Sequence, residues 1–136
     1  MRRWAEVVAG LLAPGGRLYL RDGHPMLYAL DDERADRLLV VDHPYFETEQ
    51  PQRWEAPHSY TDSREPLAQP VSYEWNHGLG EMVQAVLDAG LRLTLLEEHR
   101  ELEWPFFDWM TRTDNGRYVL PERLPLMYTL EARKDT

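Results

Sequence analysis

The sequence predicts an α/β domain, and three features of its pattern indicate this fold class. An amphipathic segment is followed by a Pro-Gly-Gly turn and an apolar strand, and a second amphipathic segment runs through a glycine directly into another strand. A third strand-like segment lies near the end of the chain. Helix, glycine and strand in succession are typical of α/β sheets. The length of 136 residues corresponds to one domain.

The first helix and strand occupy the beginning of the chain. Apolar residues recur every three or four positions over residues 4–12, which predicts a helix that ends before Pro14, because proline cannot continue it. Residues 17–21, RLYLR, place two leucines on one face and a tyrosine on the other, as in a strand. The polar residues 22–25, DGHP, end that strand, and residues 26–30 are expected to form a short helical turn.

Residues 37–75 are interpreted as an insertion. The apolar run 37–45 and the segment 71–75 predict the two strands of a hairpin, preceded by a solvated charged stretch over residues 31–37. Between the strands lies a proline-rich loop of about 25 residues, which is longer than an ordinary connection. Such a loop forms either a lid over a binding site or a disordered surface loop, and the sequence leaves both alternatives open.

The second helix and strand follow the insertion. Residues 79–87 carry apolar residues at helical spacing, and Gly90 ends this helix. Residues 91–99 alternate leucine with polar residues and predict a strand. An aromatic-rich connection over residues 103–110 leads to the final strand, expected over residues 124–132, with its proline near the start or on an edge.

Composition excludes several classes of function. Lysine and arginine number 15 against 24 aspartates and glutamates, and a net charge of -9 argues against a nucleic-acid-binding protein. The absence of cysteine excludes disulfides, thiolate zinc sites and cysteine nucleophiles. No apolar run approaches the length of a membrane span, so we expect a cytoplasmic protein with no membrane partner. The signatures of nucleophile-elbow hydrolases, serine acyl transferases and P-loop enzymes do not occur.

LLAPGGRLYLRDGHP resembles the segment that leads into the fifth sheet strand of class I S-adenosylmethionine-dependent methyltransferases. AVLDAGLRLTLLEEH and RLPLMYTLEARK are similar to that family's fifth helix, sixth strand and antiparallel seventh strand, so the resemblance covers nearly the whole chain. EWNHGLGEMVQAVLDAGL further resembles a bacterial group of small-molecule methyltransferases. The resemblance implies the C-terminal half of a Rossmann-like sheet, mixed and with an antiparallel last strand, plus a β-hairpin or lid insertion. It also implies S-adenosylmethionine as cofactor and a small-molecule methyl acceptor as partner.

The sequence also departs from that family. The family's first half carries a glycine-rich loop after its first strand and an acidic residue at the end of its second, and this chain contains neither. We therefore expect residues 1–136 to form a partial domain that faces the substrate, is inactive in isolation, and begins at an internal start or an imposed boundary. The family's strand order would leave strands five, seven and six here, and the unpaired edge of strand five predicts a homo-oligomer or strand-exchanged dimer.

Candidate site residues lie in two polar segments. His24 follows the strand over residues 17–21 at the end where α/β folds bind ligands, and His77 precedes the second helix, so each could act as the base in methyl transfer. The alternative without a functional role is that DGHP forms only a turn and that EWNH forms only a helix cap. The residues expected to contact substrate are Arg21, Asp22, Tyr45, Trp75 and Asn76. No cofactor-binding residue can be named.

Two other functions compete with the methyltransferase reading. The chain could be a methyltransferase-like module that binds a small molecule or a partner chain without catalysis. It could also be a histidine-dependent lyase or hydrolase with a lid, which would require one pocket that joins His24 and His77. The five histidines, at positions 24, 43, 58, 77 and 99, show no pair at helical ligand spacing, so we expect no metal site.

Overall fold

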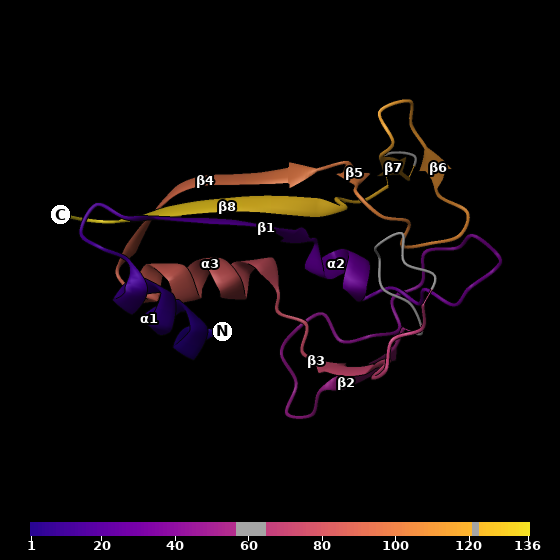
Figure 1. The fold of residues 1–136 in the computed structure, drawn as a ribbon, viewed down its shortest axis with the longest axis horizontal. Helices are drawn as coiled ribbons and strands as arrows, with labels where there is room; N and C mark the ends of the chain where they lie inside the picture. Colours follow the sequence, from indigo (N-terminus) through magenta and orange to yellow (C-terminus); the bar gives the residue numbers. More distant parts are fainter. Residues whose placement is uncertain (57–64, 121–122) are drawn as a thin grey trace.

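The computed structural model describes residues 1–56, 65–120 and 123–136. The helices are α1 (Arg2–Leu11), α2 (Pro25–Tyr28) and α3 (Leu79–Asp88), and the strands are β1 (Arg17–Gly23), β2 (Gln52–Glu55), β3 (Val71–Glu74), β4 (Leu91–His99), β5 (Glu101–Leu102), β6 (Thr111–Arg112), β7 (Tyr118–Val119) and β8 (Met127–Lys134). Figure 1 shows the main sheet above α1 and α3, with a smaller sheet and a hairpin at the other end of the molecule. The fold is α/β, as predicted.

The main sheet has the order β1-β8-β4. β8 runs antiparallel to both neighbours, so that Leu130 lies opposite Leu20 on one side and opposite Leu96 on the other. A bulge between Leu93 and Leu95 shifts the register of β4. The order agrees with the one that the resemblance implied for its strands five, seven and six.

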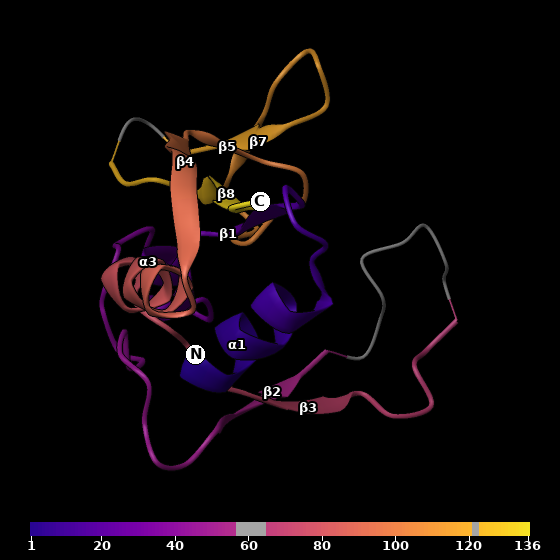
Figure 2. The same ribbon diagram turned by 90° about the vertical axis from the view of Figure 1, so that its left-hand side faces the viewer.

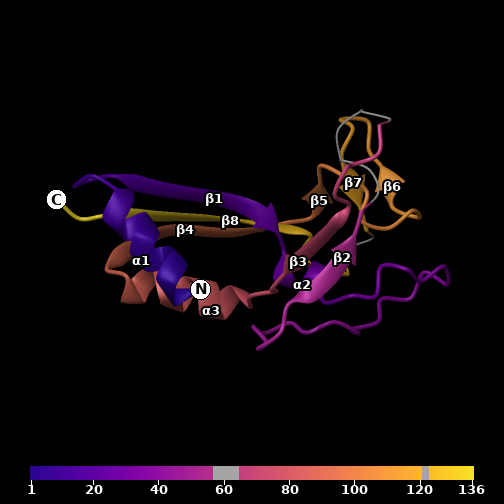
Figure 3. The same ribbon diagram turned by 60° about the horizontal axis from the view of Figure 1, so that its bottom comes forward.

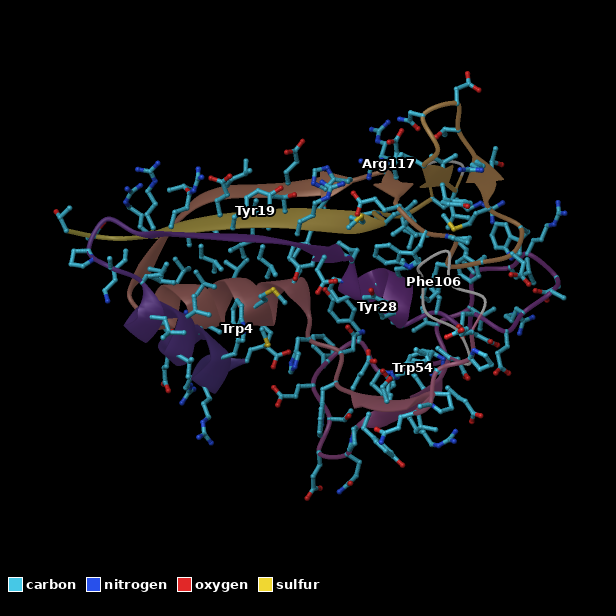
Figure 4. The ribbon with its side chains drawn as sticks, in the orientation of Figure 1. Trp4, Tyr19, Tyr28, Trp54, Phe106 and Arg117 are labelled. Carbon is cyan, nitrogen blue, oxygen red and sulfur yellow. The ribbon has the colours of Figure 1, made fainter. Side chains whose placement is uncertain are left out.

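Both long helices cover the same face of this sheet (Figures 1 and 2). The alternation of a strand sends the leucines of β1 to that face, where they meet the apolar stripes of the helices. Trp4 of α1 packs there, as Figure 4 shows below the sheet. The fully buried members of this core include Val86, Leu130 and Ala132. Burial on this one face explains why the two helices form.

The opposite face of the main sheet is open among the described residues. Tyr19 of β1 is 56% exposed and Leu95 of β4 is 37% exposed. The outer edge of β1 likewise has no pairing partner in the part of the chain that the structure describes. The sheet therefore presents both an uncovered face and an unpaired strand edge.

A second core lies beyond the end of the main sheet. Leu27 and Leu30, in and just after α2, pack with Leu102, Phe107 and Leu126. The small sheet of order β5-β7-β6 belongs to this region. We did not predict these three strands, because two-residue strands carry no readable alternation.

Two strand predictions were wrong in position. Residues 37–45 form no strand; they are tied to the end of α2 by hydrogen bonds from the amides of Asp42 and His43 to the carbonyl of Ala29. The hairpin is instead made by β2 and β3. The final strand begins at Met127, and the predicted start at residue 124 was too early, since Pro125 has no amide hydrogen to give to a ladder. No helix of the described residues is long and apolar enough to cross a membrane.

Candidate functional site

A cavity of about 190 Å³ lies at the C-terminal end of β1, between α2, the β2–β3 hairpin and the start of α3. Figure 3 shows the hairpin beside α2, and Figure 4 shows Tyr28 below α2 and Trp54 above the hairpin. The lining residues are Asp22, Gly23, Pro25, Tyr28, Gln52, Trp54, Glu74, Trp75, Asn76, His77, Met82 and Tyr128. The C-terminal end of a strand is where open α/β sheets bind ligands.

The wall of the cavity is closely packed at Gly23. A Cβ atom at this position would overlap the phenol of Tyr28, with its nearest ring carbon, Cζ, at 2.7 Å. Glycine therefore lets α2 fold back against the end of β1. This close approach places the Tyr28 ring in the cavity wall.

Asn76 holds the cavity's outer segment in place. Its Nδ2 donates to the carbonyl oxygens of Pro25 and Pro44, at 2.8 and 3.1 Å. Its Oδ1 accepts a hydrogen bond from the amide of His77 at 3.1 Å. One side chain thus joins the segment after β3 to α2 and to the loop at Pro44. The side chain predicted to contact substrate is already engaged in positioning.

His24 is buried, with 5% of its surface exposed, and both ring nitrogens have partners. Nδ1 accepts from the amide of Met26 at 3.0 Å and so caps α2, while Nε2 lies 2.9 Å from Glu98 Oε1. Burial lowers the pKa of His24, and the hydrogen bond to Glu98 opposes that effect. In this geometry His24 is a neutral structural donor and acceptor, without a free nitrogen for a substrate proton, and it does not line the cavity.

His77 does line the cavity. Its Nδ1 lies 3.4 Å from Glu47 Oε2, an ion-pair distance without hydrogen-bond geometry. Ligand atoms of Glu47, His77 and Glu81 lie within 4.8 Å of one another, which is close enough to hold a metal ion. The spacing of these three residues in the sequence did not predict that they would meet. Glu47 already contacts the N-terminal ammonium at 3.3 Å. Exposed acidic groups commonly gather without a metal, and we assign none here.

Two predicted substrate contacts lie outside the cavity. Arg21 is directed at the other side of the sheet, where it contacts Met127 Sδ at 3.9 Å and Glu103 Oε1 at 3.4 Å. The hydroxyl of Tyr45 accepts from the amide of Leu79 at 3.2 Å, so this side chain caps the start of α3. Both have structural roles in the described geometry.

Two carboxylates give the cavity a negative potential. Burial raises the pKa of Asp22, a hydrogen bond from the amide of Gly23 lowers it, and the charge of Glu74 raises it further. Burial, together with the charges of Asp22 and Glu74, raises the pKa of Tyr28 to about 12. Burial, followed by the charge of Asp22, also raises the pKa of Tyr128.

The structure thus brings four of the seven predicted site residues together: Asp22, Trp75, Asn76 and His77. Sequence reasoning missed Tyr28, Gln52, Trp54 and Glu74. Trp54 and Glu74 sit on the two paired hairpin strands, and the misplaced first strand hid their proximity. His58, expected on the surface, lies outside the described residues.

The cavity does not suit S-adenosylmethionine. Pockets for drug-sized ligands measure about 300 to 1,000 Å³, whereas this cavity measures about 190 Å³. The described residues also supply no glycine-rich loop at which a backbone could approach a nucleotide. The cavity is of a size for one small polar or charged group of a ligand.

Comparison with known proteins identifies the fold. No protein-family model matches the chain, and no curated protein matches it. The chain is similar to a crystal structure described as a "putative S-adenosylmethionine dependent methyltransferase from Listeria monocytogenes", with a TM-score of 0.60 and 16% sequence identity. The match covers 97% of this chain and 54% of that chain, so this chain spans about half the length of the structure that it resembles. At this identity the likeness shows the fold.

Proposed function

We propose that this chain is the substrate-facing part of an S-adenosylmethionine-dependent methyltransferase, and that its cavity receives a small-molecule methyl acceptor. The observation that carries the proposal is the position of the cavity: it lies at the C-terminal end of β1 in a fold shared with a structure described as a methyltransferase. The strand order β1-β8-β4 supports assignment to the C-terminal half of a Rossmann-like sheet.

The residues of this chain would bind and orient the acceptor. Methyl transfer is a displacement in line with the leaving group, so alignment of the nucleophile is the protein's main contribution. Asn76 fixes the segment that carries Trp75 and His77. Among the two predicted bases, His77 lines the cavity, and we propose it as the group that removes a proton from the acceptor. S-adenosylmethionine would be held by residues outside this chain, and it supplies the methyl group.

Calorimetric titration with S-adenosylhomocysteine tests this proposal. The titration is run on the 136-residue chain and on a version extended by the coding sequence that precedes it. We expect binding by the extended protein and none by the chain alone, because the chain lacks the glycine-rich loop. Binding by neither would contradict the proposal and favour the alternative, a methyltransferase-like module that binds a small molecule without catalysis.

The lyase or hydrolase alternative needs a pocket shared by His24 and His77. His24 is buried outside the cavity that His77 lines, so the geometry gives this alternative no support.

We also propose that the unpaired edge of β1 pairs with a strand of a second copy when the chain is studied alone. The open edge and the exposed Tyr19 beside it support this proposal. Sedimentation velocity should show a dimer or larger species, and a monomer at all concentrations would contradict it.

A further inference from the structure

The cavity combines aromatic rings with carboxylates. Tyr28 comes from α2, Trp54 from β2, and Trp75 follows β3, so three rings from separate elements face one space. Asp22 at the end of β1 and Glu74 at the end of β3 supply two carboxylates. None of the described residues that line the cavity is a lysine or an arginine. Aromatic faces and carboxylates both attract cations.

The two carboxylates lack a cationic partner within the described chain. Asp22 accepts from the amide of Gly23 at 2.7 Å, and Glu74 accepts from the hydroxyl of Ser72 at 2.6 Å, but neither forms an ion pair there. Burial is the main cause of the raised pKa of Asp22, and the negative charge of Glu74 adds to it, so the two carboxylates repel each other. A bound cation would relieve this repulsion, so the two carboxylates would stabilise a positively charged ligand in the cavity.

Gln52 adds a second recognition element. It lines the cavity, and its Nε2 is buried without a hydrogen-bond partner among the described residues. A buried donor without a partner is unfavourable, so a ligand oxygen placed there would be bound preferentially. The cavity therefore suits a ligand that carries a cation and, nearby, a hydroxyl or carbonyl oxygen.

We propose that the cavity recognises an organic ammonium group of the methyl acceptor, a small molecule that also carries an adjacent oxygen. An ammonium nitrogen has no free electron pair, so this group anchors the acceptor and is not the atom that receives the methyl group. The identification of this ligand as the acceptor rests on the proposed function, whereas the cation selectivity of the cavity does not. A volume of about 190 Å³ matches one substituted ammonium group with a short polar arm. A net charge of -9 favours the approach of a cation to the molecule as a whole.

The test compares two probes of the same shape, choline and its uncharged carbon analogue 3,3-dimethyl-1-butanol. Binding is followed by NMR through the indole N–H resonances of Trp54 and Trp75 in the full chain. Choline should shift both resonances saturably and bind at least roughly tenfold more tightly than the neutral analogue. Equal binding of the two probes, or no saturable shift with choline, would overturn the proposal.

Neutral isosteres test the carboxylates without changing their shape. Asp22→Asn and Glu74→Gln should each weaken choline binding several-fold, and together they should remove the preference over the neutral analogue. Glu55→Gln is the matched control, because Glu55 lies on the same hairpin, pairs with Arg53 at 2.8 Å, and does not line the cavity. An unchanged spectrum elsewhere shows that each variant is folded. A preference that survives the double substitution contradicts the inference.

The two proposals fail in distinguishable ways. Choline selectivity without S-adenosylhomocysteine binding by the extended protein would overturn the methyltransferase assignment and leave the ammonium site standing. Cofactor binding without choline selectivity would overturn the ammonium site alone.

Discussion

Substitution of Asn76 by alanine should loosen the cavity, because this side chain joins the cavity's outer segment to α2. The change removes three hydrogen bonds, to the carbonyls of Pro25 and Pro44 and from the amide of His77. The bond to Pro44 is exposed, so water can replace it, but the other two are partly buried. At about 1 kcal/mol for each of these two, plus a penalty for the unsatisfied Pro25 carbonyl, the loss is about 2 to 3 kcal/mol.

Urea unfolding followed by tryptophan fluorescence measures this loss. With an m-value of about 2 kcal/mol per molar urea, the midpoint should fall by about 1 M or slightly more. Gln69→Ala is the control, because Gln69 is an exposed amide side chain in the segment before β3. Its midpoint should change little. If Asn76→Ala costs no more than the control, the reasoning that Asn76 positions the cavity wall is refuted.

Three further predictions concern the fold around the site. Gly23→Ala should destabilise the fold by about 1 to 3 kcal/mol in thermal unfolding, because the added Cβ would overlap Tyr28. Gly10→Ala in α1 is the control: a Cβ there would meet nothing within 4 Å, so this change should stabilise the helix by up to about 1 kcal/mol. Folding lowers the pKa of His24 from 6.5, so its contribution to the free energy of unfolding should be fully present above pH 6.5 and be lost as the pH falls below that value. A His24→Asn variant whose free energy of unfolding falls with pH as steeply as that of the original chain would contradict this. Lys134→Met should lower the free energy of unfolding by about 2 kcal/mol in urea, because Nζ donates to the carbonyls of Ala9 and Leu12, at 2.8 and 3.0 Å. An unchanged free energy of unfolding would show that these two hydrogen bonds do not stabilise the fold.

The main sheet and its helices could be predicted from the sequence because each is specified locally. The stripe of α1, the turn at Gly15 and the alternation of β1 are readable over short windows, and Gly15 does adopt a φ of 75°. The same holds for α3, Gly90 and β4. The order β1-β8-β4 required a resemblance, since strand pairing across the chain leaves no local signal.

The insertion could not be predicted in the same way. Residues 37–45 are apolar enough for a strand, yet Leu38 is 56% exposed and Val41 is 58% exposed, and tertiary contacts with the end of α2 decide their conformation. The strand that pairs with β3 is the more polar segment QRWE. Intrinsic strand preference is weak beside such contacts.

The candidate site was predicted where polar residues follow an element, and missed where residues converge from separate elements. Asp22, Asn76 and His77 lie at element ends, which the sequence marks. Tyr28 and Trp54 reach the cavity only through the folding of α2 and the hairpin. His24 lies between two residues that line the cavity, Gly23 and Pro25, but its burial and its two hydrogen-bond partners arise only in the folded chain and give it a structural role.

The most direct test of the account is a crystal structure of the extended protein with bound S-adenosylhomocysteine. The account predicts that the cofactor's sulfur faces the opening of the cavity lined by Asp22, Trp75 and His77, because a methyl group must reach an acceptor held there. A cofactor bound far from this opening, or no bound cofactor at saturating concentration, would contradict the assignment of the cavity to the methyl acceptor.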